Sequence, residues 1–152
     1  MKVKLDEGAK MPLRAHDTDA GYDLFAREDF VVPRSLTGDD FFGHSFMPVT
    51  VGSATHDTGV HIEIPKGYVG FIKSKSGLNV KHGLTAEGVI DSGYTGSIVV
   101  KLYNHTDKVY KFKKGDKITQ LVILPIYTPD LELVMDLDAT ERGDGGFGST
   151  GK

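Results

Sequence analysis

Hydrophobic residues fall along this chain in short stretches separated by polar, glycine-containing segments. Four of these stretches are VHIEI (60–64), YVGFI (68–72), SIVVKLY (97–103) and ITQLVILPI (118–126). They are rich in Val, Ile, Phe and Tyr, and several alternate between apolar and polar residues, as half-buried strands do. Many short strands joined by turns predict an all-β barrel or sandwich. Helical periodicity is weak, and one short helix is expected between Ser74 and Leu84, with Ser76 near its start.

Three segments interrupt this pattern. Residues 34–58 make a connection long enough to indicate a functional or disordered insertion. Residues 130–138 are acidic and are expected to solvate a late strand or turn. The end of the chain carries five glycines among residues 142–151, too many for a packed element. We therefore expect a β-barrel domain at 1–138, with the insertion at about 34–58, followed by a flexible lid at 139–152.

Composition and net charge exclude several classes of protein. A chain of 152 residues fits one domain, and the absence of cysteine excludes a disulfide scaffold and thiolate chemistry. The six histidines show no metal-ligand spacing and are read mainly as surface or packing residues. A net charge of −3 argues against nucleic-acid binding, and no apolar run indicates a membrane span or signal peptide. A cytoplasmic protein is expected, in the host cytoplasm if the source is a virus.

Two segments could bind an anion. In KSKSGL (73–78) a turn that opens the expected helix gathers free N–H groups, with Lys75 and Ser76 as ligands. An ordinary capped turn is the alternative. In the tail, Arg142 offers a planar fork of donors, Ser149 and Thr150 add hydroxyls, and Phe147 adds a flat ring. A disordered tail could share this composition by chance.

The segment 88–104 is predicted to form a β-hairpin around Ser92 and Gly93. Asp91, where the first strand enters the turn, is either a turn-capping residue or a general base that faces a pocket. The ring of Tyr94 is either a platform for a ligand or hairpin packing.

Two weaker signals involve single strands or loops. Asp17, Asp19 and Asp23 could bind a hard cation, although their spacing does not match an EF-hand loop. The alternative is a polar loop that leads into a strand. Gln120 is a lone polar residue among Ile and Leu, which is usually a solvated strand position.

Taken together, five segments resemble the motifs of the trimeric dUTPase family, in the family's order. They are AGYDL, KSGL, GVIDSGYTG, GDKITQLV and RGDGGFGSTG, and the resemblance runs from Ala20 to Gly151 apart from residues 34–58. It implies a jelly-roll β fold and hydrolysis of dUTP. It also implies a homotrimer with shared active sites, in which the tail of one chain closes the site of another.

The resemblance also implies a role for each residue of the hairpin motif. Asp91 would orient and activate the attacking water. Tyr94 would pack on the deoxyribose and leave no room for a 2′-hydroxyl. The hairpin backbone at 85–88, Gly88 included, and at 98–100 would bind the uracil edge.

The other motifs would bind the triphosphate and Mg²⁺. Lys75, Ser76 and Gly77 would contact the phosphates, although the family usually has Arg at the position of Lys75. Gln120 would contact a phosphate or a metal-bound water, and Asp23 would support the metal indirectly. The tail residues expected at the phosphates and the base are Arg142, Phe147, Gly148, Ser149 and Thr150.

Two other functions stay open. A deoxycytidine triphosphate deaminase shares the fold and hairpin but needs a glutamate where this chain has Lys101. A regulatory protein on the same scaffold could bind a protein partner through the 34–58 insertion.

Overall fold

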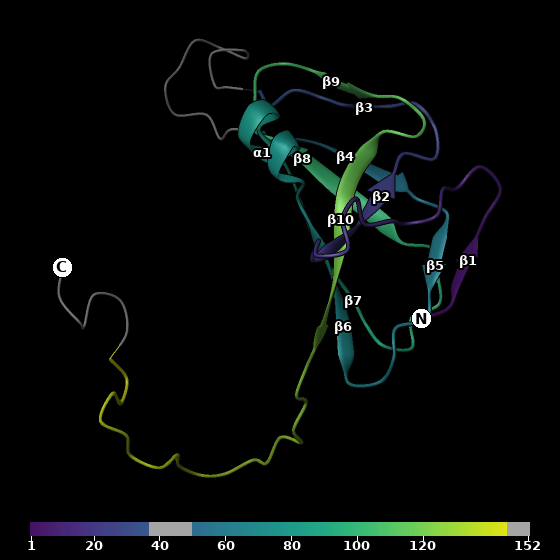
Figure 1. Cartoon of the computed structure of the whole chain (residues 1–152). Coiled ribbons are helices and arrows are strands. Elements are labelled where there is room, and N and C mark those ends of the chain that lie inside the picture. Colours follow the sequence, from purple (N-terminus) through teal and green to yellow (C-terminus); the bar gives the residue numbers. More distant parts are fainter. Residues whose placement is uncertain (37–49, 146–152) are drawn as a thin grey trace, which may run out of the picture.

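The computed structural model describes residues 1–36 and 50–145. In chain order its elements are β1 Val3–Leu5, β2 Gly21–Phe25, β3 Phe30–Val32, β4 Gly52–Asp57, β5 Val60–Ile62, β6 Tyr68–Lys73, α1 Ser76–His82, β7 Leu84–Ile90, β8 Val99–Asn104, β9 Tyr110–Phe112 and β10 Lys117–Pro125. A six-stranded antiparallel sheet has the order β2-β10-β6-β7-β8-β4, and the pairs β1-β5 and β3-β9 flank it (Figure 1). The expected all-β fold with one short helix is confirmed.

The core follows from the period-two pattern of the strands. In β8, Val100 and Leu102 are buried whereas Val99 and Lys101 are exposed. The sheet curls around side chains contributed by nearly every strand, in agreement with a jelly-roll barrel. The large hydrophobic side chains with almost no exposure are Leu24, Ile72, Leu84, Ile98, Leu102, Ile118 and Leu121.

The segment expected as an insertion, 34–58, contains a strand of the main sheet. β4 pairs with β8 along its whole length, from Gly52 opposite Asn104 to Asp57 opposite Val99. The β4 sequence GSATHD lacks the large apolar residues that mark a strand, because β4 lies at the edge of the sheet. Residues 37–49, the middle of the expected insertion, lie outside the described residues.

After β10 the chain leaves the sheet and runs away from it (Figure 1). Every residue from Leu124 to Asp144 is exposed. Leu131, Leu133 and Met135 are almost completely exposed, at 97%, 99% and 102%. No helix in the described part of the chain is long and apolar enough to cross a membrane.

Candidate functional site

A tight turn places Asp91 and Tyr94 next to each other. The N–H of Tyr94 donates to the carbonyl of Asp91 at 3.2 Å, and Gly93 between them has φ +90°. A positive φ at the third position of a four-residue turn is the type II geometry that glycine adopts without strain. The turn therefore holds the ends of the DSGY sequence within about 7 Å of each other.

The ring of Tyr94 lies across the backbone of its own loop. Its hydroxyl donates to the carbonyl of Ser97 at 2.9 Å. A methyl group on Gly96 would lie 2.4 Å from that hydroxyl oxygen, so only glycine leaves room for the ring there. The ring lines a cavity of about 240 Å³ together with Asp91, Val89 and Val99. A carboxylate and an aromatic ring therefore border the same cavity.

Toward this turn, β7 and β8 separate from each other. Their pairing covers only Leu84 to Ala86, opposite Leu102 to Asn104. Further along, Gly88 pairs with Ile72 of β6, and β8 pairs with β4 on its other side. In the described residues no strand pairing joins the facing edges of β7 and β8 past Ala86. These edges are therefore open to hydrogen-bond a flat ligand.

A second cluster surrounds Asp23, which is 4% exposed. Its carboxylate forms ion pairs with Lys75 and, at 2.6 Å, with Lys117. Burial alone would raise the pKa of Asp23, but the hydrogen bonds from Lys117 and Lys75 hold the pKa below its usual value. The sequence reading missed Lys117, although it lies in the GDKITQLV motif, in the same strand as Gln120.

Gln120 lies in the same row of the sheet. It is directly opposite Asp23 on β2 and Lys73 on β6, and its amide nitrogen donates to the carbonyl of Ser74 at 3.0 Å. Ser76 and Gly77 follow as the exposed first residues of α1. The first N–H groups of a helix have no acceptor within it, so they can bind an anion. The structure thus brings Asp23, Lys75 and Gln120 together beside the start of α1.

The two clusters lie at different levels along β7, one beside the middle of the strand and the other just past its C-terminal end. Glu87 is paired with Lys73 in the Gln120 row, and Asp91 lies four residues further along, which is about 13 Å in a strand. Arg142 joins neither cluster, because its guanidinium donates locally to the carbonyl of Gly145 at 3.0 Å. The remaining predicted tail residues lie outside the described residues: Phe147, Gly148, Ser149 and Thr150.

The carboxylates of the predicted acidic cluster do not gather at one point. Asp19 accepts a hydrogen bond from the backbone N–H of His16 at 3.0 Å, whereas the carboxylate of Asp23 forms an ion pair with Lys75. Among residues 1–36 and 50–145 there is no group of three acidic, His or Cys side chains that could hold a metal.

Comparison with known proteins places this chain among sequences of one family. A sequence model of the dUTPase family matches residues 7–151. The deoxyuridine 5′-triphosphate nucleotidohydrolase of Paramecium bursaria Chlorella virus 1 is 42% identical over 97% of this chain and 94% of its own length. The enzyme of that name from Clostridium tetani is 41% identical over 100% of this chain and 97% of its own length.

Solved structures extend the likeness to three dimensions. The Staphylococcus bacteriophage 80alpha dUTPase, solved with dUpNHpp, superposes with a TM-score of 0.82 at 33% identity, covering 99% of this chain and 98% of that one. A mutant dUTPase from phage phi11 of S. aureus, described as coordinating a structural Mg(II) ion, gives 0.73 at 31% identity over 91% and 98%. The chain belongs to the dUTPase family.

Proposed function

We propose that this protein hydrolyses dUTP to dUMP and pyrophosphate, which removes dUTP and supplies dUMP for thymidylate synthesis. The observation that carries the proposal is the turn that sets Asp91 and Tyr94 on one cavity beside the open β7–β8 edges. Relatives that match nearly the whole chain carry the name of this activity. The reaction is expected in the cytoplasm.

The hairpin end of the site selects the uracil base and activates the attacking water. Backbone groups of β7 and β8 hydrogen-bond the uracil edge, and cytosine would leave such groups unpaired at a cost of about 1–3 kcal/mol each. Tyr94 packs on the deoxyribose. Asp91, exposed at the end of β7, accepts a proton from the water that attacks the α-phosphorus in line. The bond from that phosphorus to the bridging oxygen breaks, and pyrophosphate leaves.

The α1 end binds phosphates. Ser76 and Gly77 supply the hydroxyl and the N–H groups at the start of the helix. Lys75 neutralises a phosphate as a point charge, without the planar fork of an arginine. Because Asp23 binds both Lys75 and Lys117, it fixes the position of Lys75 and leaves a net positive charge for the anion.

The donor set suits Mg²⁺ that arrives with the nucleotide. Mg²⁺ keeps several waters and commonly binds substrate phosphates with few protein ligands. Asp23 and Gln120 would contact its waters. When bound, Mg²⁺ neutralises the triphosphate and fixes its conformation.

We further propose a homotrimer with shared sites. Supporting this, the Asp91 end and the Gln120 row lie about 13 Å apart along one strand, so one chain does not join all five motifs. The exposed residues 130–138 alternate acidic and apolar side chains, as a strand does when one face is covered. A neighbouring subunit would provide that cover, and the lid at 139–152 would then close a neighbour's site.

A substrate panel tests the reaction. We expect pyrophosphate release with Mg²⁺ from dUTP and at least a hundredfold less from dCTP, dTTP and UTP. Cytosine leaves backbone groups unpaired, whereas the methyl group of dTTP and the 2′-hydroxyl of UTP meet close packing. Equal turnover of dCTP or dTTP would refute uracil selection. Removal of Mg²⁺ with a chelator should abolish turnover and leave the fold intact.

Deamination is the weaker alternative. Lys101 occupies the position of the required glutamate, and its ammonium lies 5.1 Å from the ring centre of Tyr103 on the exposed side of β8. Ammonia release from dCTP would favour it. A protein partner bound through residues 34–58 stays a prediction, because residues 37–49 lie outside the described residues.

A further inference from the structure

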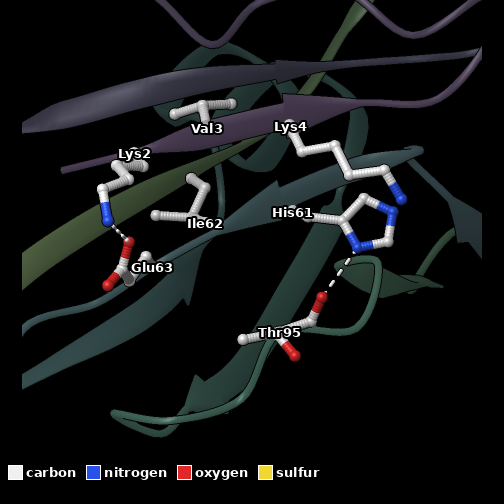
Figure 2. Close-up of a pocket in the computed structure, with 7 residues that line it drawn as sticks. All are labelled: Lys2, Val3, Lys4, His61, Ile62, Glu63 and Thr95. Atoms are coloured by element: carbon white, nitrogen blue, oxygen red, sulfur yellow. Dashed lines mark hydrogen bonds and ion pairs between the residues drawn. The ribbon is translucent and has the colours of Figure 1, made fainter.

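The loop at 91–97, which carries Asp91 and Tyr94, is held by side chains from two neighbouring strands. Figure 2 shows His61 of β5 reaching to this loop, where Nδ1 lies 2.8 Å from the carbonyl oxygen of Thr95. Two residues further on, the hydroxyl of Ser97 donates to the carboxylate of Asp57. The loop is therefore held at two points by residues outside the five motifs.

The contact to Thr95 fixes the protonation of one ring nitrogen of His61. A carbonyl oxygen can only accept, so Nδ1 must carry hydrogen. The other nitrogen, Nε2, lies 3.2 Å from a carboxylate oxygen of Asp6, an ion-pair distance. It has no hydrogen bond of good geometry in the described residues. A carboxylate favours a proton on Nε2 as well, so the imidazolium form suits both contacts.

The two points of attachment are joined through a single guanidinium. Arg27 lies 3.8 Å from Asp6 and 3.5 Å from Asp57. Its Nε also donates to the carbonyl of Glu7 at 2.9 Å, which limits the movement of the side chain. One network of charges thus spans the base of the loop, from Thr95 through His61 to Ser97.

We propose that His61, charged and held by Asp6, is a positioning residue that sets the place of Asp91 and Tyr94 by fixing the backbone at Thr95. This inference rests on the proposed function of that loop. The reacting groups lie on an exposed turn, so the contacts at the base of the loop add to the hydrogen bonds within it. Small misplacements of reacting groups are costly.

The electrostatics of the network agree with the proposal. The bond to Thr95 and then the Asp6 carboxylate raise the pKa of His61 above its usual value, against some desolvation and repulsion from Lys4. The neighbouring His61 in turn lowers the pKa of Asp6. The other charged groups nearby are Arg27, behind Asp6, and Glu63, which pairs with Lys2 at 3.0 Å. A raised pKa means that the charged contact of Nε2 with Asp6 is complete at low pH and is lost as the pH rises through that pKa, whereas Nδ1 keeps its hydrogen for Thr95.

Two substitutions separate the contacts of His61. His61→Asn keeps an amide donor at the place of Nδ1 and loses the reach to Asp6, whereas His61→Gln keeps the reach and loses the donor to Thr95. We expect His61→Gln to lower kcat for dUTP about five- to tenfold, the loss that corresponds to one hydrogen bond, with a smaller change in KM. His61→Asn and Asp6→Asn should retain most of kcat at neutral pH.

The dependence of kcat on pH distinguishes a positioning role of His61 from a purely structural one. In the wild type, the minor part of kcat that depends on the Asp6 contact should disappear as the pH rises past the raised pKa of His61, and this part should be absent from both His61 variants and from Asp6→Asn. Glu63→Gln, on the same cavity wall but outside the network, is the control and should keep the wild-type profile. Thermal unfolding and trimer mass, measured on each variant, confirm that folded proteins are compared.

Three results decide whether His61 is a positioning residue. The expected loss in His61→Gln, with recovery in His61→Asn, supports positioning. A wild-type kcat and pH profile in folded His61→Gln overturns it while leaving the proposed function intact, provided that Asp91→Asn is inactive in the same assay. A wild-type protein without dUTP turnover overturns both.

Discussion

The 91–97 loop and the tail after β10 are both exposed connections without regular structure, yet they are held very differently. Hydrogen bonds hold the loop in place. The hydroxyl of Tyr94 donates to the carbonyl of Ser97, His61 Nδ1 to that of Thr95, and the hydroxyl of Ser92 to that of Ile64 at 3.2 Å. In residues 126–145 the hydrogen bonds are almost all local, such as Arg142 with Gly145.

This difference indicates which parts of the site one chain can preorganise. Asp91 and Tyr94 are held in place before any substrate binds, so their contribution needs little ordering. The tail must be ordered when it binds, and that ordering costs conformational entropy. We therefore expect the loop to determine chemistry and base selection, and the tail to determine closure.

The largest effect should come from the loop itself. Asp91→Asn keeps the size of the side chain and the turn but removes the proton acceptor, so kcat should fall about a thousandfold. The affinity for a non-hydrolysable dUTP analogue should stay near that of the wild type. Pyrophosphate release and calorimetric titration measure the two quantities. Near-normal turnover would exclude Asp91 as the general base.

The tail should have the next largest effect. Ending the chain at Ala139 should lower kcat/KM about a hundredfold, because the phosphates lose their cover and their donors. The unfolding temperature should barely change, since residues 126–144 are exposed.

Mixing this truncated chain with the Asp91→Asn protein tests whether the tail acts on a neighbour. If a site takes Asp91 and the tail from different chains, mixed trimers contain complete sites, and activity should reappear after joint refolding. No recovery after proven subunit exchange would show that each tail closes the site of its own chain.

The Asp23 cluster should show a stability effect with little change in the loop. Asp23→Asn removes a buried carboxylate and leaves two lysines without their partner, at a cost of about 2–3 kcal/mol in the free energy of unfolding. Because the folded pKa of Asp23 is depressed, this stabilisation is full above its ordinary pKa and is lost as the pH falls through the folded pKa.

Denaturant unfolding between pH 7 and pH 3 measures this effect. The difference between wild type and Asp23→Asn should shrink toward the acid end. A difference that stays constant with pH would mean that the carboxylate charge is not the source of the stabilisation.

The smallest effect tests how closely the loop fits Tyr94. A methyl group at Gly96 would displace the ring, so Gly96→Ala should reduce discrimination against UTP about tenfold. Tyr94→Phe is the matched variant, because it keeps the ring and loses only the bond to Ser97. The ratio of kcat/KM for dUTP and UTP measures both. Unchanged discrimination in Gly96→Ala would contradict the role of the ring.

Local sequence predicted much of this arrangement. The pattern of apolar stretches predicted β5, β6, β8 and β10, and the helix begins at Ser76 as expected. The DSGY turn was readable because Gly93 supplies the positive φ that the turn requires. β4 was missed, since a polar edge strand is recognisable only from its pairing with β8.

The sequence by itself determined the β class, the turn that joins Asp91 to Tyr94, and the residue types able to bind a nucleotide. These depend on periodicity and turn chemistry, which act over a few residues. Only the tertiary structure decided that Lys117 shares Asp23 with Lys75, and that His61 and Asp57 hold the 91–97 loop. Such contacts join strands far apart in the chain, and no local pattern encodes which side chains the sheet will bring together.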